Sequence, residues 1–229
     1  MKRLLLGLGV VGSIYIFLAA TWFGHSLGIW PSLKGVPAPD WTEAVGFVFG
    51  VWTVYLTVIE NIWNWPVGLV NSAFYAWVFG TAGLYMDAGL AVVYVIVGIY
   101  GWYWWLFGGQ KKDDLPITYT PRNQHVVLGI MTLGAGVLMW QLNIKLGGSA
   151  PIPDAALTAI SLLAQYMLTR KYIENWVFWI IADICYIPLF FWKGLNLTGL
   201  LYFIFLGLAI SGYLNWRKLM AEQSAMPSA

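Results

Sequence analysis

Long apolar stretches separated by short polar breaks run along the whole chain. Because a helix needs about 20 apolar residues to cross a bilayer, the pattern predicts eight transmembrane helices, near residues 4–23, 42–60, 65–82, 86–107, 125–146, 154–170, 173–192 and 197–216. Proline, glycine and charged residues mark the breaks, most clearly over 31–40, 108–121 and 147–153. We therefore expect an all-α integral membrane protein.

Composition strengthens this interpretation. The chain has 229 residues, of which 60% are hydrophobic and only 10% are charged, whereas soluble domains carry about 25% charged residues. A chain of this size cannot bury so much apolar surface away from water, so that surface must face lipid. The net charge of +2 gives no reason to expect a nucleic-acid partner.

Cysteine and histidine are too sparse for a metal or catalytic centre. The single cysteine, Cys185, excludes an internal disulfide and a multi-cysteine metal site. The two histidines, His25 and His125, lie near segment ends and far apart in the sequence. We therefore expect no cofactor, no bound metal and no enzymatic activity.

Basic residues set the expected orientation. With the N-terminus in the cytoplasm, eight spans place nine of the twelve basic residues on the cytoplasmic side: Lys2, Arg3, Lys111, Lys112, Arg122, Arg170, Lys171, Arg217 and Lys218. Cytoplasmic loops of membrane proteins are enriched in Lys and Arg, so both termini are expected in the cytoplasm. The first segment also begins like a signal peptide, but its bulky end at Trp22 and Phe23 favours a retained helix.

The two halves of the chain are similar in sequence when they are aligned so that Asn64 matches Asn175. Ten identities then fall in 42 ungapped positions, among them Asn64-Trp65 with Asn175-Trp176, where composition alone would give roughly three. The alternative is chance similarity between two aromatic-rich membrane segments. Four spans separate equivalent positions, so the two copies point the same way through the bilayer. Parallel repeats are a transporter design, with the substrate site near the midplane between the halves.

The expected architecture is a 3+1+3 parallel-repeat core with an extra N-terminal helix. Residues 1–41 form that helix and its loop, 42–107 the first three-helix repeat and 108–153 the linking helix. Residues 154–218 form the second three-helix repeat, and 219–229 form a cytoplasmic tail.

One carboxylate, Asp183, is predicted at mid-bilayer, where an ionisable residue is costly and marks a functional site. Trp176, Trp179, Asp183 and Tyr186 follow spacings of three, four and three residues, which place them on one helical face. Aromatic faces bind cations, and a carboxylate can balance a positive ring. The alternative is that the tryptophans are interfacial anchors, which suits Trp176 but does not explain Asp183.

Charges at the span ends are instead expected to be solvated: Glu43, Glu60, Asp87, Asp154, Arg170, Lys171 and Glu174. The first repeat offers Asn64, Asn71 and Tyr75 at helical spacings, with Asn71 near mid-membrane. Gln141, on the linking helix, is a further candidate. Amides at such depths bind either a polar substrate or a neighbouring helix. Pro188 lies inside a span and is expected to kink it.

The segment Asn175-Trp-Val-Phe-Trp-Ile-Ile-Ala-Asp183 resembles the W-x-x-W-x-x-x-[N/D] motif of the PnuC vitamin transporters. The stretch from Tyr186 to Gly194 and the ending Gly212-Tyr-Leu-Asn-Trp-Arg-Lys218 are also similar to this family. The resemblance covers most of 42–218. The first half departs from the motif, because Gly68 stands three residues after Trp65.

The resemblance implies uptake of nicotinamide riboside across a bacterial inner membrane by a fold like that of the SWEET sugar transporters. It implies facilitated diffusion, a homotrimer, and a cytoplasmic kinase that traps the vitamin. It also implies that Trp176, Trp179 and Asp183 contact the substrate, a ribose joined to a flat cationic ring. Relatives carry thiamine, riboflavin or deoxynucleosides, so the same fold with another vitamin is the alternative.

The pattern of charges favours uncoupled alternating access, in which the two halves rock around the midplane site. No chain of acidic residues for proton coupling is visible beside Asp183. A membrane enzyme acting on a lipid-linked substrate would need a cluster of nucleophile, base or metal ligands, and none is present. A purely structural membrane protein would have no reason to place a carboxylate at mid-bilayer.

Overall fold

The computed structural model describes residues 41–81, 85–109, 114–146, 151–192 and 196–225. These residues form seven helices, α3 (Trp41–Val58), α4 (Asn64–Thr81), α5 (Tyr85–Phe107), α6 (Arg122–Lys145), α7 (Pro151–Thr169), α8 (Asn175–Trp192) and α9 (Asn196–Ala225). The described residues contain no strand, only an isolated parallel bridge between Thr118 and Tyr172.

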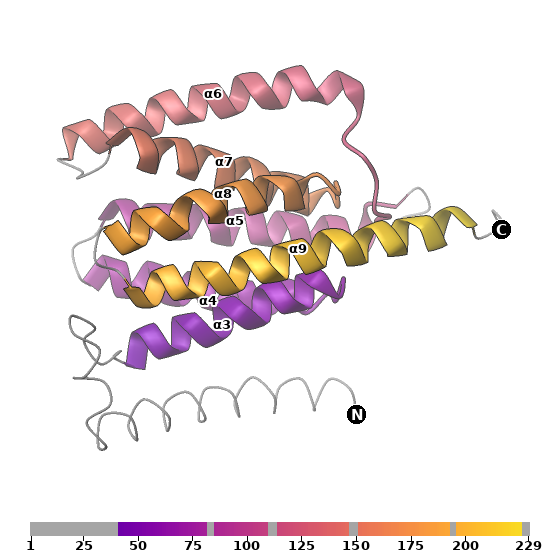
Figure 1. Ribbon diagram of the computed structural model, residues 1–229, viewed down its shortest axis with the longest axis horizontal. Helices are drawn as coiled ribbons and strands as arrows, with labels where there is room; N and C mark the ends of the chain where they lie inside the picture. Colours follow the sequence, from indigo (N-terminus) through magenta and orange to yellow (C-terminus); the bar gives the residue numbers. More distant parts are fainter. Residues whose placement is uncertain (1–40, 82–84, 110–113, 147–150, 193–195, 226–229) are drawn as a thin grey trace.

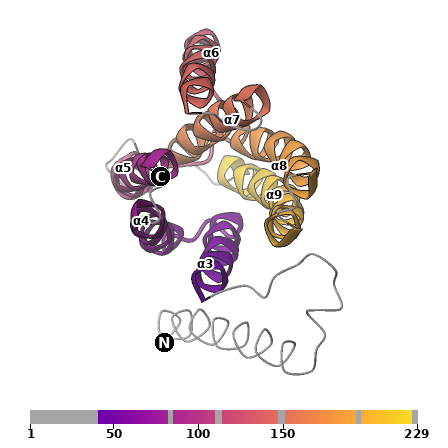
Figure 2. The same ribbon diagram turned by 90° about the vertical axis from the view of Figure 1, so that its left-hand side faces the viewer.

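Six helices close into a ring. Each packs on its neighbours in the order α3, α4, α5, α7, α8, α9 and back to α3, while α6 packs only on α7. Figure 2 looks along the helices and shows α6 outside this ring, and Figure 1 shows the same helices side by side. The helices α3–α5, here the first unit, and α7–α9, the second unit, therefore meet along two seams, α3–α9 and α5–α7.

The exposed surface suits lipid, not water. Four helical segments of the described chain are long and apolar enough to cross a membrane: Ala88–Phe107, Arg122–Lys145, Asn175–Trp192 and Thr198–Ala225. Leu133 on α6 and Trp192 on α8 are 73% and 69% exposed, whereas Asn175 and Asp183 are buried. Apolar groups outside and polar groups inside are what a bilayer requires. The chain is a multi-pass membrane protein.

The predicted spans agree with the helices to within a few residues, except at the end of α9. We expected that span to end near 216, but α9 continues to Ala225. Hydrophobicity ends with the bilayer, whereas the helix continues through good helix formers, with Lys218 and Glu222 paired at 3.9 Å. The predicted span 4–23 lies outside the described residues, so the count of eight stays a prediction.

Contacts recur between positions that the internal repeat makes equivalent. Trp65 meets Trp105 edge to face at 5.5 Å and 87°, and Trp176 meets Trp216 at 5.4 Å and 90°. Tyr75 stacks on Phe79 at 5.3 Å, and Tyr186 stacks on Phe190 at 5.3 Å. The two units thus share internal packing as well as sequence identities.

Candidate functional site

The stripe predicted on α8 faces the interior of the ring. Asp183 is 3% exposed and Trp176 is 2% exposed, while Trp179 and Tyr186 are half-buried. Ile181 and Ile184, between them on the helix, are 43% and 53% exposed and belong to the outer face. The helix continues through Pro188 to Trp192. The spacing of three, four and three residues therefore selects one inward face, as predicted.

Trp176 is wedged between α8 and α9. Its ring fills the space that a side chain on Gly212 would need and packs edge to face on Trp216. Its indole N–H is buried without a partner in the described part of the chain. In this conformation the ring has no open face for a ligand, so its geometry is that of a packing residue. Trp179, by contrast, borders the same apolar cluster and is only partly buried.

Tyrosine side chains from four helices lie near one another, and two of them lie near Asp183. Tyr202 of α9 lies 4.9 Å from Tyr186, ring centroid to ring centroid, and both lie within electrostatic range of Asp183. Tyr202 also lies within electrostatic range of Tyr94 on α5 and of Tyr75 on α4. The phenol groups near the carboxylate thus come from the second unit, and tyrosines of the first unit adjoin them; the hydroxyl of Tyr75 lies against α3 at Gly46.

Two buried side-chain oxygen atoms lie at the depth of Asp183. Asn71 Oδ1 on α4 has no hydrogen-bond partner within the described residues, and Ser161 Oγ on α7 lies beside the Tyr186 hydroxyl. Asn71 and Asp183 stand seven and eight residues after the first residue of their helices, and Ser161 stands eight residues before the last residue of α7, about 10–12 Å along the axis. Because native proteins satisfy nearly all buried polar atoms, this polar layer is suited to a ligand. The sequence prediction missed Ser161, although a serine in mid-span could have signalled it.

The other predicted site residues lie away from this layer. Asn64 is 2% exposed at the start of α4, and its Nδ2 donates to Thr57 Oγ1 at 3.1 Å. Its place at a helix end separates it from Asn71 by two turns. Gln141 is exposed on α6, the helix outside the ring. Trp179, Asp183 and Tyr186 thus lie on the inward face of α8. Asn71 lies at the depth of Asp183, and Tyr75 lies within electrostatic range of Tyr202. Asn64 and Gln141 lie elsewhere.

The expectation of solvated charges at the span ends is wrong for three residues. Lys171 Nζ and Glu60 Oε1 form an ion pair at 2.6 Å, and their side chains are 6% and 19% exposed. Glu174 accepts bonds from the backbone N–H and the hydroxyl of Thr120, each at 3.0 Å to Oε2. The turns that carry these residues are distant in the sequence but pack on one another at this end of the ring. No local sequence pattern predicts such a contact. The signal available was opposite charge at two positions that the internal repeat makes equivalent.

The chemistry of the layer is that of binding, not catalysis. It combines one buried carboxylate, the unpartnered Asn71 Oδ1, the Ser161 hydroxyl and several aromatic rings. Within the described ranges, no group of three or more His, Cys, Asp or Glu residues could hold a metal ion. A planar, polar and cationic molecule would find a partner for each of its parts here.

Comparison with known families gives this arrangement its context. Residues 40–218 match the family described as nicotinamide mononucleotide transporter. The chain belongs to this family. It is accordingly a membrane transporter and not an enzyme, and the interior-facing layer of polar and aromatic groups is the natural candidate for its substrate site.

Individual relatives agree with the family assignment. The chain is 28% identical over 215 residues to the nicotinamide riboside transporter PnuC of Escherichia coli (strain K12), covering 81% of this chain and 89% of the relative. It is also 28% identical over 186 residues to the riboflavin/roseoflavin transporter RibM of Streptomyces davaonensis, covering 77% and 84%. The crystal structure of the vitamin B3 transporter PnuC superposes with a TM-score of 0.65 at 23% identity, covering 93% of this chain and 92% of that one, which shows a shared fold.

Proposed function

We propose that this transporter carries nicotinamide riboside, and that Asp183 balances the positive charge of its pyridinium ring. The observation that carries the proposal is the burial of this carboxylate, 3% exposed, at a depth where burying a charge is unfavourable unless a partner is supplied. A cationic substrate supplies that partner. Relatives named as nicotinamide riboside transporters, including one from Neisseria mucosa at 28% identity over 218 residues, support the choice.

The negative charge proposed for Asp183 also discriminates between the candidate substrates. A nicotinamide mononucleotide would bring a phosphate, whose negative charge would be repelled by Asp183. Riboflavin is neutral and brings no positive group that would favour the ionised form of a buried carboxyl group. Nicotinamide riboside has a positive ring and no phosphate, so it fits best.

The surrounding residues take complementary roles in the proposed site. Trp179 and Tyr186 flank the flat ring, because aromatic faces stabilise a cation. Asn71, Ser161 and Tyr75 exchange hydrogen bonds with the ribose hydroxyls, which would satisfy the unpartnered Asn71 Oδ1. Trp176 and Asn64 do not contact the substrate, but they hold in place the helices that carry the site. Gln141 has no part in this arrangement.

The mechanism we propose is alternating access without ion coupling. The two units are parallel repeats of an eight-helix, 3+1+3 protein, and they rock about the polar layer. We place the protein in a bacterial inner membrane, and the nine-to-three split of basic residues supports both termini in the cytoplasm. Phosphorylation by a cytoplasmic kinase would then make uptake directional. The exposed apolar face of α6, whose residues include Ile130 and Met131 at 65% exposure, is compatible with the trimer that the family resemblance implies.

Binding measurements test the substrate assignment. Isothermal calorimetry on the purified chain in detergent should detect binding of nicotinamide riboside, and binding of nicotinamide mononucleotide and riboflavin should be at least about tenfold weaker. Equal or tighter binding of riboflavin or of the mononucleotide would overturn the assignment. Thiamine, whose ring is also cationic, tests whether charge alone is sufficient.

A further inference from the structure

Two helix ends carry charged residues where glycine is the usual choice. Glu60 follows α3 with φ 53°, and Lys171 follows α7 with φ 50°. The Glu60 N–H bonds to the Thr57 carbonyl at 3.0 Å, and the Lys171 N–H bonds to the Leu168 carbonyl at 3.0 Å. Helices commonly end in this left-handed turn, which glycine adopts without steric penalty. The two charged residues therefore stand at positions where the backbone favours glycine.

These two side chains reach each other across the ring. Lys171 Nζ donates to Glu60 Oε1 at 2.6 Å and lies 4.5 Å from the centroid of the Trp105 ring. Glu60 and Trp105 belong to the first unit and Lys171 to the second, so this buried ion pair links the two units.

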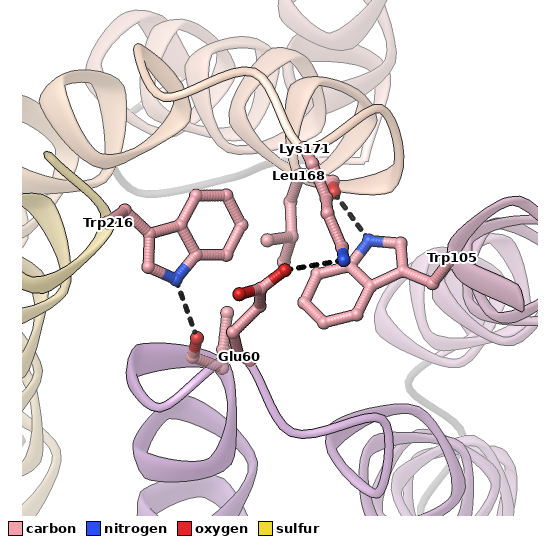
Figure 3. A network of polar contacts seen from close by, with 6 residues as sticks. Glu60, Trp105, Leu168, Lys171 and Trp216 are labelled. Carbon is pink, nitrogen blue, oxygen red and sulfur yellow. Dashed lines mark hydrogen bonds and ion pairs between the residues drawn. The ribbon is translucent and has the colours of Figure 1, made fainter. Parts of the chain in front are cut away.

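Two indole bonds cross between the units beside the pair. Trp105 Nε1, on α5, donates to the Leu168 carbonyl on α7 at 3.0 Å. Trp216 Nε1, on α9, donates to the Thr57 carbonyl on α3 at 3.0 Å. Each carbonyl also closes the turn that carries Glu60 or Lys171. Figure 3 shows the reciprocal arrangement, with the ion pair between the two indoles.

We propose that Glu60 and Lys171 form the gate that closes the transport path at the end predicted to be cytoplasmic. The inference rests on the proposed function, in which substrate leaves the polar layer between the two units. At this end of the helices, the Trp105 hydrogen bond closes the α5–α7 seam and the Trp216 hydrogen bond closes the α3–α9 seam. The ion pair lies between them. Opening the path here requires Glu60 to separate from Lys171.

The surroundings make that separation feasible. A hollow of about 400 Å³ lies against the pair, lined by Glu60, Ile62, Trp105, Asp114, Leu115, Pro116, Lys171 and Gln223. Asp114, Leu115 and Pro116 follow α5, and Gln223 lies in the part of α9 beyond Trp216, so the hollow is at the end of the ring. Polar groups and water in it can solvate the two charges when they part. A buried pair without such a neighbour would resist opening, because each separated charge would stay desolvated.

Thiol labelling tests the gate directly. Leu168 lies beside the pair and is 7% exposed, so Leu168→Cys, in a Cys185→Ala background, reports whether this end is open. A membrane-impermeant maleimide should label it slowly in the otherwise unchanged chain. In Glu60→Gln or Lys171→Met, one buried charge loses its partner, and labelling should be about tenfold faster or more.

Three further variants separate gating from folding. Glu60→Gly with Lys171→Gly keeps the favoured turn while removing both charges, and should also label fast. Exchanging the two residues, Glu60→Lys with Lys171→Glu, restores a pair of opposite charge and places the lysine beside Trp216. This variant should label slowly. Lys218→Met with Glu222→Gln removes the exposed pair on α9 and should label like the unchanged chain. Equal labelling of all of these proteins would overturn the gate.

Cross-linking gives a second, independent measurement. With Cys185→Ala, Glu60→Cys and Lys171→Cys, a short bis-methanethiosulfonate, which joins the two thiols through disulfides and releases sulfinate, should stop entry of nicotinamide riboside into proteoliposomes, and reduction should restore it. Binding of nicotinamide riboside, measured by calorimetry, should survive the cross-link within about threefold. Unimpeded transport by the cross-linked protein would overturn the gate. Failure of the unchanged chain to carry nicotinamide riboside would overturn the proposed function, while the labelling result would still stand.

Discussion

Asp183 is the residue on which the proposed recognition of charge depends. Hydrogen bonds and contacts to a charged group contribute about 1.5–3 kcal/mol. Asp183→Asn should therefore weaken binding of nicotinamide riboside about 10–100-fold. The reduced, neutral form of the same nucleoside should lose much less affinity, because its ring carries no charge to balance. Calorimetry with both ligands measures the ratio.

The control for this substitution is Glu222→Gln, an exposed carboxylate on α9, which should leave both affinities unchanged. If Asp183→Asn weakened both ligands by the same factor, the carboxylate would be acting through structure and not through charge.

At the residue scale, sequence alone could identify Asp183, because its depth follows from counting along one span. It could not assign Trp176, whose motif implies substrate contact but whose ring packs against Gly212 and Trp216. It also treated Glu60 and Lys171 as solvated, since their pairing joins turns that are distant in the chain. Local spacing gives depth and face, but contacts between elements need the three-dimensional arrangement.

Packing of α8 on α9 depends on one glycine. A side chain at Gly212 would meet the Trp176 ring, whereas a side chain at Gly207 would meet nothing within 4 Å. Gly212→Ala should lower stability by about 1–3 kcal/mol, as overpacking does. Gly207→Ala, on the same helix, should leave stability unchanged or raise it slightly. Thermal unfolding in detergent compares the two, and equal midpoints would contradict the close packing.

The segment between α5 and α6 is held by Glu174. Its carboxylate accepts bonds from Thr120, next to the bridge between Thr118 and Tyr172. Glu174→Ala should release this segment, so hydrogen exchange over 117–121 should become about tenfold faster, consistent with a loss of ~1–2 kcal/mol of local stability. Exchange in the middle of α8 should not change. Unaltered exchange over 117–121 would mean that these bonds do not anchor the segment.

At the element scale, hydropathy located the helices well because lipid imposes both length and apolar composition on each span. It failed at the end of α9, where the helix leaves the bilayer but its residues still favour helix. It also could not show that α6 lies outside the ring, since a lipid-facing helix and a ring helix have similar composition.

At the scale of the whole molecule, six of the seven described helices form a ring with polar groups inside and apolar groups outside, and α6 lies outside the ring. The internal repeat indicates how such a ring can be divided. Equivalent tryptophans, tyrosines and turn residues make matching contacts in both units. The ion pair of Glu60 with Lys171 then joins equivalent positions that carry opposite charges. In the proposed mechanism, this division into two units lets one end open while the other stays closed.

Entry of labelled nicotinamide riboside into sealed proteoliposomes, with no ion gradient, is the measurement that tests the account most directly. The internal concentration should rise to the external value and stop there, and Asp183→Asn should slow the approach about tenfold or more at low substrate concentration. Failure of the unchanged chain to admit the nucleoside would contradict the assigned substrate. Accumulation above the external concentration under a proton or sodium gradient would contradict uncoupled transport.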